Sequence, residues 1–137
     1  MNEHLKMEGR TVMVHPELYD DPAEKTGMTG TIRSVDISGN DFFVDFPDGK
    51  LGRYGADALL VLKKPEDIHQ VLENDKGTLT LAERKDLFNI TLFQNYGFPE
   101  QVKTALEMAR NRPVVRELGL RSLEDSLGMN QSRARGR

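Results

Sequence analysis

The sequence contains only three histidines, His4, His15 and His69, and they fall on three different predicted elements. None of them has a serine, a carboxylate or a second histidine at a spacing typical of a catalytic triad or a zinc site. Cysteine is absent, which excludes a thiol nucleophile, a thiolate metal site and a disulfide framework. Glycine-rich phosphate loops and the Gly-x-Ser-x-Gly motif of hydrolases are also missing. We therefore predict that the protein is not an enzyme and needs no cofactor.

A short acidic segment could supply oxygen ligands to a cation, since four carboxylates lie within eight residues: Glu17, Asp20, Asp21 and Glu24. A calcium loop places its ligands at alternate positions, with a glycine turn and a closing glutamate, and that order is missing here. The segment is therefore predicted to be a solvated loop without a metal. If this loop recognises a partner, its charge favours a basic one.

Aromatic side chains offer a second kind of chemistry. Tyr19 lies in the acidic loop, Phe43 lies on the less apolar face of a predicted strand, and Tyr54 lies near a predicted strand end. Together with Asp48 they could hold a cation or stack a base, so these four residues are the predicted contacts for a protein partner. In the alternative interpretation Phe42 and Phe46 fill the core while Phe43 packs against the helices.

Arginines suggest an alternative, nucleic-acid partner. The formal net charge of −3 excludes a protein that is basic over its whole surface, as histones are. The segment 110–137, however, carries seven arginines and three carboxylates, a net charge of +4. Phosphate binding there would weaken steeply with salt. The predicted contacts for this alternative are Arg33, Arg53, Arg133, Arg135 and Arg137.

The elements that must position these residues change in kind at Pro65. Before it, short alternating runs separated by Gly, Asn and Pro predict five strands, at about 11–15, 27–37, 42–46, 51–54 and 59–62. A flat sheet of this size would expose two edges and an apolar face, whereas closure into a barrel removes the edges. We therefore expect a small five-stranded barrel.

After Pro65 the apolar spacing becomes helical. Prolines at helix starts, a Thr80-x-x-Glu83 capping box and glycines at helix ends predict helices at about 65–76, 81–95 and 99–111, with shorter ones at 113–118 and 122–127. The helix at 81–95 is apolar nearly all round, so we expect it to be the most buried. Four leucines are expected to close the core over Phe88 and Phe93, or else to form a groove for another chain: Leu118, Leu120, Leu123 and Leu127.

The order of motifs in the first half resembles the small SH3-like β-barrels, including the KOW-type and Tudor-type modules. The resemblance covers residues 9–62 and rests on three segments: Gly9-Arg10-Thr11-Val12, Gly27-Met28-Thr29-Gly30-Thr31-Ile32 and the hairpin residues Val44, Phe46, Asp48 and Gly49. Members of that superfamily bind peptides, methylated side chains or nucleic acid on the loops between their first strands. The resemblance therefore implies binding rather than catalysis, without naming a ligand.

The sequence as a whole predicts an α+β protein, with an SH3-like barrel at residues 7–64, a helical subdomain at 65–128 and a disordered basic tail at 129–137. We expect a non-catalytic interaction module that binds a protein through its barrel loops, with an RNA- or DNA-associated role as the alternative. Long apolar runs and an apolar leader are absent, so a cytoplasmic protein without membrane segments is expected.

Overall fold

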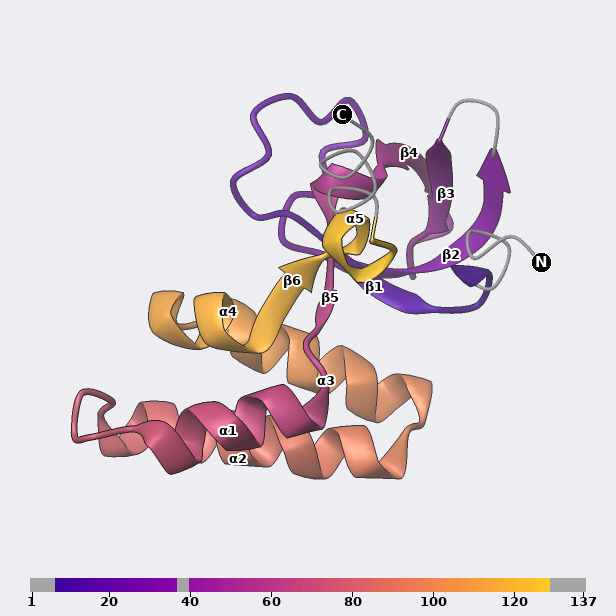
Figure 1. The fold of residues 1–137 in the computed structure, drawn as a ribbon. Helices are drawn as coiled ribbons and strands as arrows, with labels where there is room; N and C mark the ends of the chain where they lie inside the picture. The colour runs from indigo at the N-terminus through magenta and orange to yellow at the C-terminus, as the bar shows by residue number, and fades with distance from the viewer. Residues whose placement is uncertain (1–6, 37–39, 129–137) are drawn as a thin grey trace, which may run out of the picture. The chain divides into compact units, whose positions relative to one another are not determined.

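The computed structural model describes residues 7–36 and 40–128, and within them the chain is α+β, as the sequence predicts. It forms two compact units (Figure 1). One comprises Met1–Val61 together with Ser122–Arg137, and the other comprises Leu62–Arg121. The first contains most of the antiparallel sheet, and the second contains four helices. The predicted basic tail, with Arg133, Arg135 and Arg137, lies outside the described residues, as does His4.

The five predicted strands are all present. They are β1 (Thr11–Val14), β2 (Thr29–Asp36), β3 (Asp41–Asp45), β4 (Leu51–Gly55) and β5 (Leu59–Leu62), with a 3₁₀ turn, η2 (Ala56–Ala58), between the last two. A sixth strand, β6 (Leu120–Ser122), was not predicted. The hydrogen-bonded order is β4-β3-β2-β1-β5-β6.

The closed barrel expected from the sequence is not detected. Within the described residues the antiparallel sheet is open, with β4 and β6 as its edges. The reason lies in the order of the strands, because the second neighbour of β5 is β6 and not β4.

Alternation along the strands builds the core of the first unit. On β3 the side chains of Phe42 and Val44 are fully buried, while the alternating residues Asp41, Phe43 and Asp45 are partly exposed. The core also contains Val12, Val14, Ile32, Phe46, Tyr54, Leu59 and Val61. At Gly30, a Cβ atom would lie 2.6 Å from the carbonyl oxygen of Asp45, so this close approach of β2 to β3 needs glycine.

The first unit is completed by α5 (Leu123–Ser126), a single turn that Ser122 caps by accepting a hydrogen bond from the Asp125 amide, 3.0 Å away. Leu123 is fully buried in the core of the sheet, and Leu127 packs against that core. The expectation that these leucines cover Phe88 and Phe93 is therefore wrong for this pair. Leucine spacing indicates an apolar face but does not indicate which core that face joins.

The second unit contains α1 (Pro65–Asn74), α2 (Leu81–Tyr96), α3 (Pro99–Arg110) and α4 (Pro113–Gly119). Their starts are the predicted ones, and their ends lie within two residues of the predicted ends. Prolines occupy the first turns of α1, α3 and α4, and Gly97 ends α2 with a left-handed φ of 75°. The predicted capping box is confirmed, because the Thr80 hydroxyl accepts from the Glu83 amide while the Glu83 carboxylate accepts from the Thr80 amide.

The core of the helical unit is formed by fully buried side chains on every one of its helices: Ile68, Leu87, Ile90, Ala105, Leu106, Ala109 and Val115. The expectation that α2 is the most buried helix is wrong, because the shorter α3 buries as many residues as α2 does. Helix α2 buries Leu87, Ile90 and Thr91, whereas Phe88 and Leu92 are 49% and 42% exposed. Only one side of α2 packs against the other helices of this unit, so its second apolar side stays in contact with solvent.

Candidate functional site

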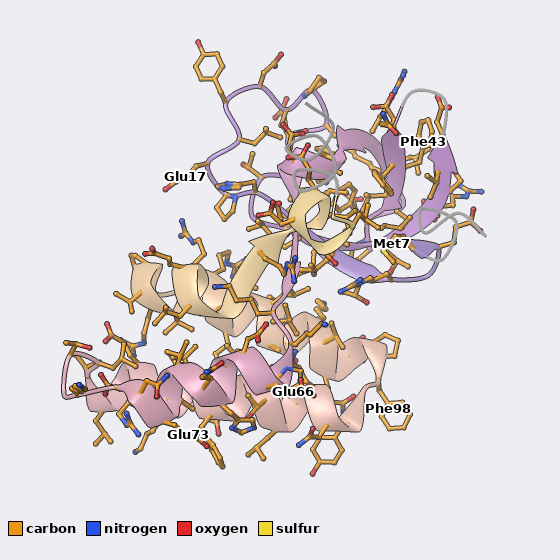
Figure 2. The ribbon with its side chains drawn as sticks, viewed as in Figure 1. Met7, Glu17, Phe43, Glu66, Glu73 and Phe98 are labelled. Atoms are coloured by element: carbon orange, nitrogen blue, oxygen red, sulfur yellow. The ribbon has the colours of Figure 1, made fainter. Side chains whose placement is uncertain are left out.

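The long loop between β1 and β2, residues 15–28, contains no helix or strand, and Glu17 marks its first half in Figure 2. Asp21 organises this loop from within. Its Oδ1 atom accepts a hydrogen bond from the Ala23 amide, 3.1 Å away, and its Oδ2 atom accepts from the Lys25 amide, 2.7 Å away. One carboxylate thus closes two backbone turns in the second half of the loop.

Two side-chain pairs tie the loop to the β3–β4 hairpin. The Tyr54 hydroxyl, on β4, donates to Oδ1 of Asp21 over 2.9 Å. The Lys25 ammonium donates to the carboxylate of Asp48, which lies in the turn between β3 and β4. Both connections are long-range along the chain, so they restrict the loop relative to the sheet far more than contacts within the loop do.

Lys25 is 7% exposed, which is unusual for a lysine. Its ammonium lies 5.7 Å from the centroid of the Phe46 ring, so the ring face and the Asp48 carboxylate both stabilise the charge. Phe46 in turn meets Tyr54 edge to face, with ring centroids 6.3 Å apart and an interplanar angle of 82°. Lys25, Phe46, Tyr54, Asp21 and Asp48 form one connected group, called here the loop anchor.

The loop anchor perturbs two titratable groups. The hydrogen bond from Lys25, followed by that from the Lys50 amide, holds the pKa of Asp48 below its ordinary value of 3.8. Burial, followed by the hydrogen bond to Asp21, raises the pKa of Tyr54 well above its ordinary value of 10.0. Both shifts favour the protonation states that keep the loop attached to the hairpin, an ionised Asp48 and a neutral Tyr54.

Of the four predicted partner contacts, the structure brings two together. Tyr54 and Asp48 both belong to the loop anchor, where Tyr54 is 4% exposed and the carboxylate of Asp48 is paired with Lys25. Tyr19 is fully exposed on the loop and therefore forms no cage with the buried Tyr54. Phe43 lies on the outward face of β3, with the Arg53 guanidinium 5.9 Å from its ring centroid.

Sequence reasoning missed Asp21 and Lys25 as members of this group. Asp21 was counted with the solvated carboxylates, yet it accepts three hydrogen bonds. An Asp-x-Ala-x-Lys segment between prolines and glycines carries an Asx-turn signal, which could have indicated the role of Asp21. Nothing in the local sequence indicates that Lys25 is buried, because its carboxylate partner lies 23 residues away.

The two described arginines of the nucleic-acid alternative are paired with carboxylates on β3. The Arg53 Nε atom donates to Oδ2 of Asp41 over 2.8 Å, and Nη1 of Arg33 lies 3.6 Å from Oδ1 of Asp45. The bond to Asp41 raises the pKa of Arg53. This outward face of the sheet therefore balances its charges internally, around Phe43.

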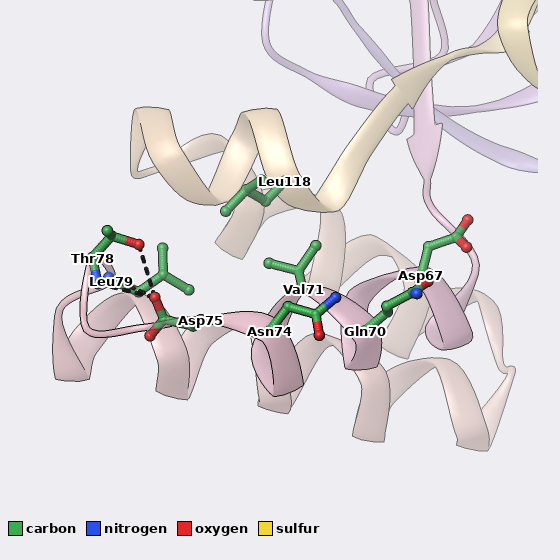
Figure 3. A pocket seen from close by; sticks show the side chains of 8 residues that line it. All are labelled: Asp67, Gln70, Val71, Asn74, Asp75, Thr78, Leu79 and Leu118. Carbon is green, nitrogen blue, oxygen red and sulfur yellow. Dashed lines mark hydrogen bonds between the residues drawn. The ribbon is translucent and has the colours of Figure 1, made fainter.

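The helical unit has a pocket of about 490 Å³ between α1, the α1–α2 connection and α4 (Figure 3). Its lining mixes apolar and polar side chains: Asp67, Gln70, Val71, Asn74, Asp75, Thr78, Leu79 and Leu118. Asp75 accepts from the Thr78 hydroxyl and from Arg84, each over 2.8 Å. The first of these bonds is the largest cause of its lowered pKa. Asp75 is thus engaged in holding the α1–α2 connection.

The described residues contain neither a cluster of metal ligands nor a membrane-spanning helix. Among residues 7–36 and 40–128, no three His, Asp or Glu side chains come together as a metal site would require. None of the helices in the described part of the chain is both long and apolar enough to span a bilayer.

Comparison with known proteins is negative at every level. No family model, curated protein or solved structure matches this chain.

Proposed function

We propose that the N-terminal unit is a non-catalytic, SH3-like interaction module that binds a protein partner through the loop 15–28. The SH3-like assignment is supported by the strand order β4-β3-β2-β1-β5 and by the 3₁₀ turn η2 between β4 and β5. In this arrangement the last strand of the meander returns beside the first, as it would in an open relative of such a barrel.

One observation carries the proposal: Tyr19 is fully exposed on a loop whose second half is held by the loop anchor. A tyrosine supplies a large amphipathic contact at a low entropic cost, and tyrosines are enriched among binding hot spots. The loop anchor reduces the entropy that the loop loses on binding, because the neighbouring backbone is already ordered.

The charge around Tyr19 favours a basic partner. Glu17, Asp20 and Glu24 are exposed on the same loop, whereas the buried Lys25 is neutralised by Asp48. A partner segment with Lys or Arg beside an apolar residue would match both features. Nucleic acid would be repelled by this loop, and Arg33 and Arg53 would have to leave their carboxylates to bind phosphate. The nucleic-acid alternative stays a prediction that rests on the C-terminal arginines.

The test is an amide NMR titration of the ¹⁵N-labelled full chain with a panel of basic peptides that contain an aromatic or aliphatic residue. Binding should shift the amides of residues 16–28, and Tyr19→Ala should weaken it at least about tenfold, since hot-spot truncations cost about 2 kcal/mol or more. Tyr96→Ala, which removes a tyrosine that is 67% exposed on the helical unit, is the matched control.

Peptide binding that Tyr19→Ala leaves unchanged would overturn the assignment of the loop. A parallel titration with a mixed oligonucleotide pool separates the two partner classes. Shifts at the C-terminal arginines with oligonucleotide, and none with any peptide, would favour the nucleic-acid alternative instead.

A further inference from the structure

The exposed side of α2 is an apolar surface that neither the helical core nor the proposed loop site explains. Large side chains remain exposed along its whole length: Leu81 (70%), Phe88 (49%), Leu92 (42%) and Tyr96 (67%). Phe98, at the turn into α3, is 64% exposed and extends the same surface, projecting from the helix end in Figure 2. We call these five residues the α2 face.

The α2 face is large for a surface that serves no contact. Its five side chains expose roughly 600 Å², at the upper limit of the largest apolar patch on a typical monomer. A standard protein interface buries about 800 Å² on each partner, so two such faces together would make an interface at the small end of that class. The area is thus sufficient for a dimer of moderate affinity.

The spacing along α2 is that of a helix-pairing seam. Positions 81, 85, 88, 92 and 95 follow one another at intervals of four, three, four and three residues. Two of these positions are polar, Lys85 and Asn95, and both are exposed. A polar residue in such a seam specifies register and orientation, because it must meet a compatible partner.

We propose that the α2 face binds a second copy of this chain, with the two α2 helices antiparallel about a two-fold axis that crosses the α2 face midway between Phe88 and Leu92. In that register Phe88 meets Leu92 of the second copy. Lys85 meets Asn95, whose side-chain carbonyl can accept from the ammonium, and Leu81 lies opposite Phe98. Every seam position thus finds a matching partner, as an isologous interface requires.

The parallel arrangement is disfavoured by charge. It would bring Lys85 against Lys85 in the middle of an apolar surface, where like charges destabilise the contact. Lys85 is the one charged residue among the five seam positions, and the antiparallel register places it opposite Asn95, so this repulsion is avoided.

Sedimentation equilibrium of the full chain over a wide concentration range tests self-association. The mass should rise from that of a monomer to twice that value, with a dissociation constant on the order of micromolar, as expected for an interface of this size. Phe88→Asp should weaken the dimer at least about tenfold. Leu51→Asp, at a similarly exposed leucine (47%) on β4, should leave it unchanged, as should Tyr19→Ala.

Cysteine cross-linking tests the relative orientation of the two α2 helices. The native chain contains no cysteine, so every disulfide must come from the introduced residues. Lys85→Cys mixed with Asn95→Cys should give a disulfide-linked heterodimer under mild oxidation, whereas each variant alone should not cross-link at these sites. Because both positions are exposed, these variants keep the fold even if Phe88→Asp does not, and far-UV circular dichroism checks each one.

Three results would overturn the proposal. A monomer at every concentration would show that the α2 face does not self-associate. A dimer that Phe88→Asp leaves intact would place the interface elsewhere. Efficient cross-linking of Lys85→Cys with itself would exclude the antiparallel register.

Discussion

Replacing Tyr54 by phenylalanine removes one hydroxyl from the loop anchor and leaves the ring in place. The ring keeps its edge-to-face contact with Phe46, because that contact involves carbon atoms only. What is lost is the 2.9 Å hydrogen bond to Asp21, the carboxylate that organises the loop. The variant therefore measures how strongly this side-chain bond ties the loop to β4.

The size of the effect follows from the surroundings of the bond. A hydrogen bond to a charged group contributes about 1.5–3 kcal/mol. The lower end applies here, because Asp21 is only partly buried and keeps the amides of Ala23 and Lys25 as donors. Tyr54→Phe should thus lower the free energy of unfolding of the first unit by about 1.5 kcal/mol at neutral pH.

The raised pKa of Tyr54 adds a pH signature. The folded state retains the phenol proton above pH 10, where the unfolded chain begins to release it. This contribution to stability is complete below about pH 10 and is lost as the pH rises towards the folded pKa, with a slope of up to about 1.4 kcal/mol per pH unit. The phenylalanine variant lacks this slope, so the two proteins should become more similar in stability at alkaline pH.

Urea unfolding followed by the amide NMR signals of residues 41–55 reads the first unit specifically. Tyr19→Phe is the matched control, because it removes a hydroxyl from a fully exposed ring. A loss within about 0.5 kcal/mol of that control would refute the structural role of the bond, since surface substitutions fall in this range. An alkaline slope shared by wild type and Tyr54→Phe would refute the assignment of the pKa shift.

Three further perturbations probe other parts of the chain. Gly30→Ala should destabilise the sheet by about 2 kcal/mol, because the new Cβ would overlap the backbone of β3; an unchanged urea midpoint would contradict this. Thr80→Ala should lower the free energy of unfolding by about 1 kcal/mol, because it removes the capping box of α2. Thermal unfolding measures this loss against the control Thr104→Ala, in which the lost hydroxyl donates to the Glu100 carbonyl of its own helix. Asp48→Asn should lower stability at neutral pH by leaving Lys25 without its carboxylate. The pKa of Asp48 is lower in the folded state than in the unfolded chain, so this stabilisation is lost as the pH falls below about 4. The urea midpoints of wild type and Asp48→Asn should therefore converge in acid. A difference that stays constant with pH would contradict the pairing of Asp48 with Lys25.

Local signals in the sequence were sufficient for the elements themselves. The five strands, the helix starts at Pro65, Pro99 and Pro113, and the capping box at Thr80 were all predicted close to their observed positions. Each of these features depends on residues within one turn or one strand, and such short-range preferences operate before any tertiary contact forms. The sixth strand was missed because its three residues are too few to show the alternation of apolar and polar side chains that indicates a strand.

Local sequence patterns could not show whether the sheet closes into a barrel. The strand pattern favours a barrel, because closure removes exposed edges, but the neighbours of β5 depend on where the chain returns after the helices. β6 begins at Leu120, so its pairing with β5 joins two segments that are separated in sequence by four helices. Similarly, leucine spacing in α5 predicted an apolar face, but tertiary packing assigned Leu123 to the core of the sheet.

The composition and local patterns of this chain thus determined its class, its elements and the exclusion of thiol chemistry. Tertiary structure alone decided which polar groups are buried and which apolar groups are exposed. Tyr54 and Asp21 are 33 residues apart, and Lys25 and Asp48 are 23 apart, so no local pattern links them. In α2 the sequence shows two apolar sides, and only packing within the helical unit reveals that one of them remains exposed. A side chain becomes buried because of what packs against it in space, and that neighbour is set by the fold as a whole.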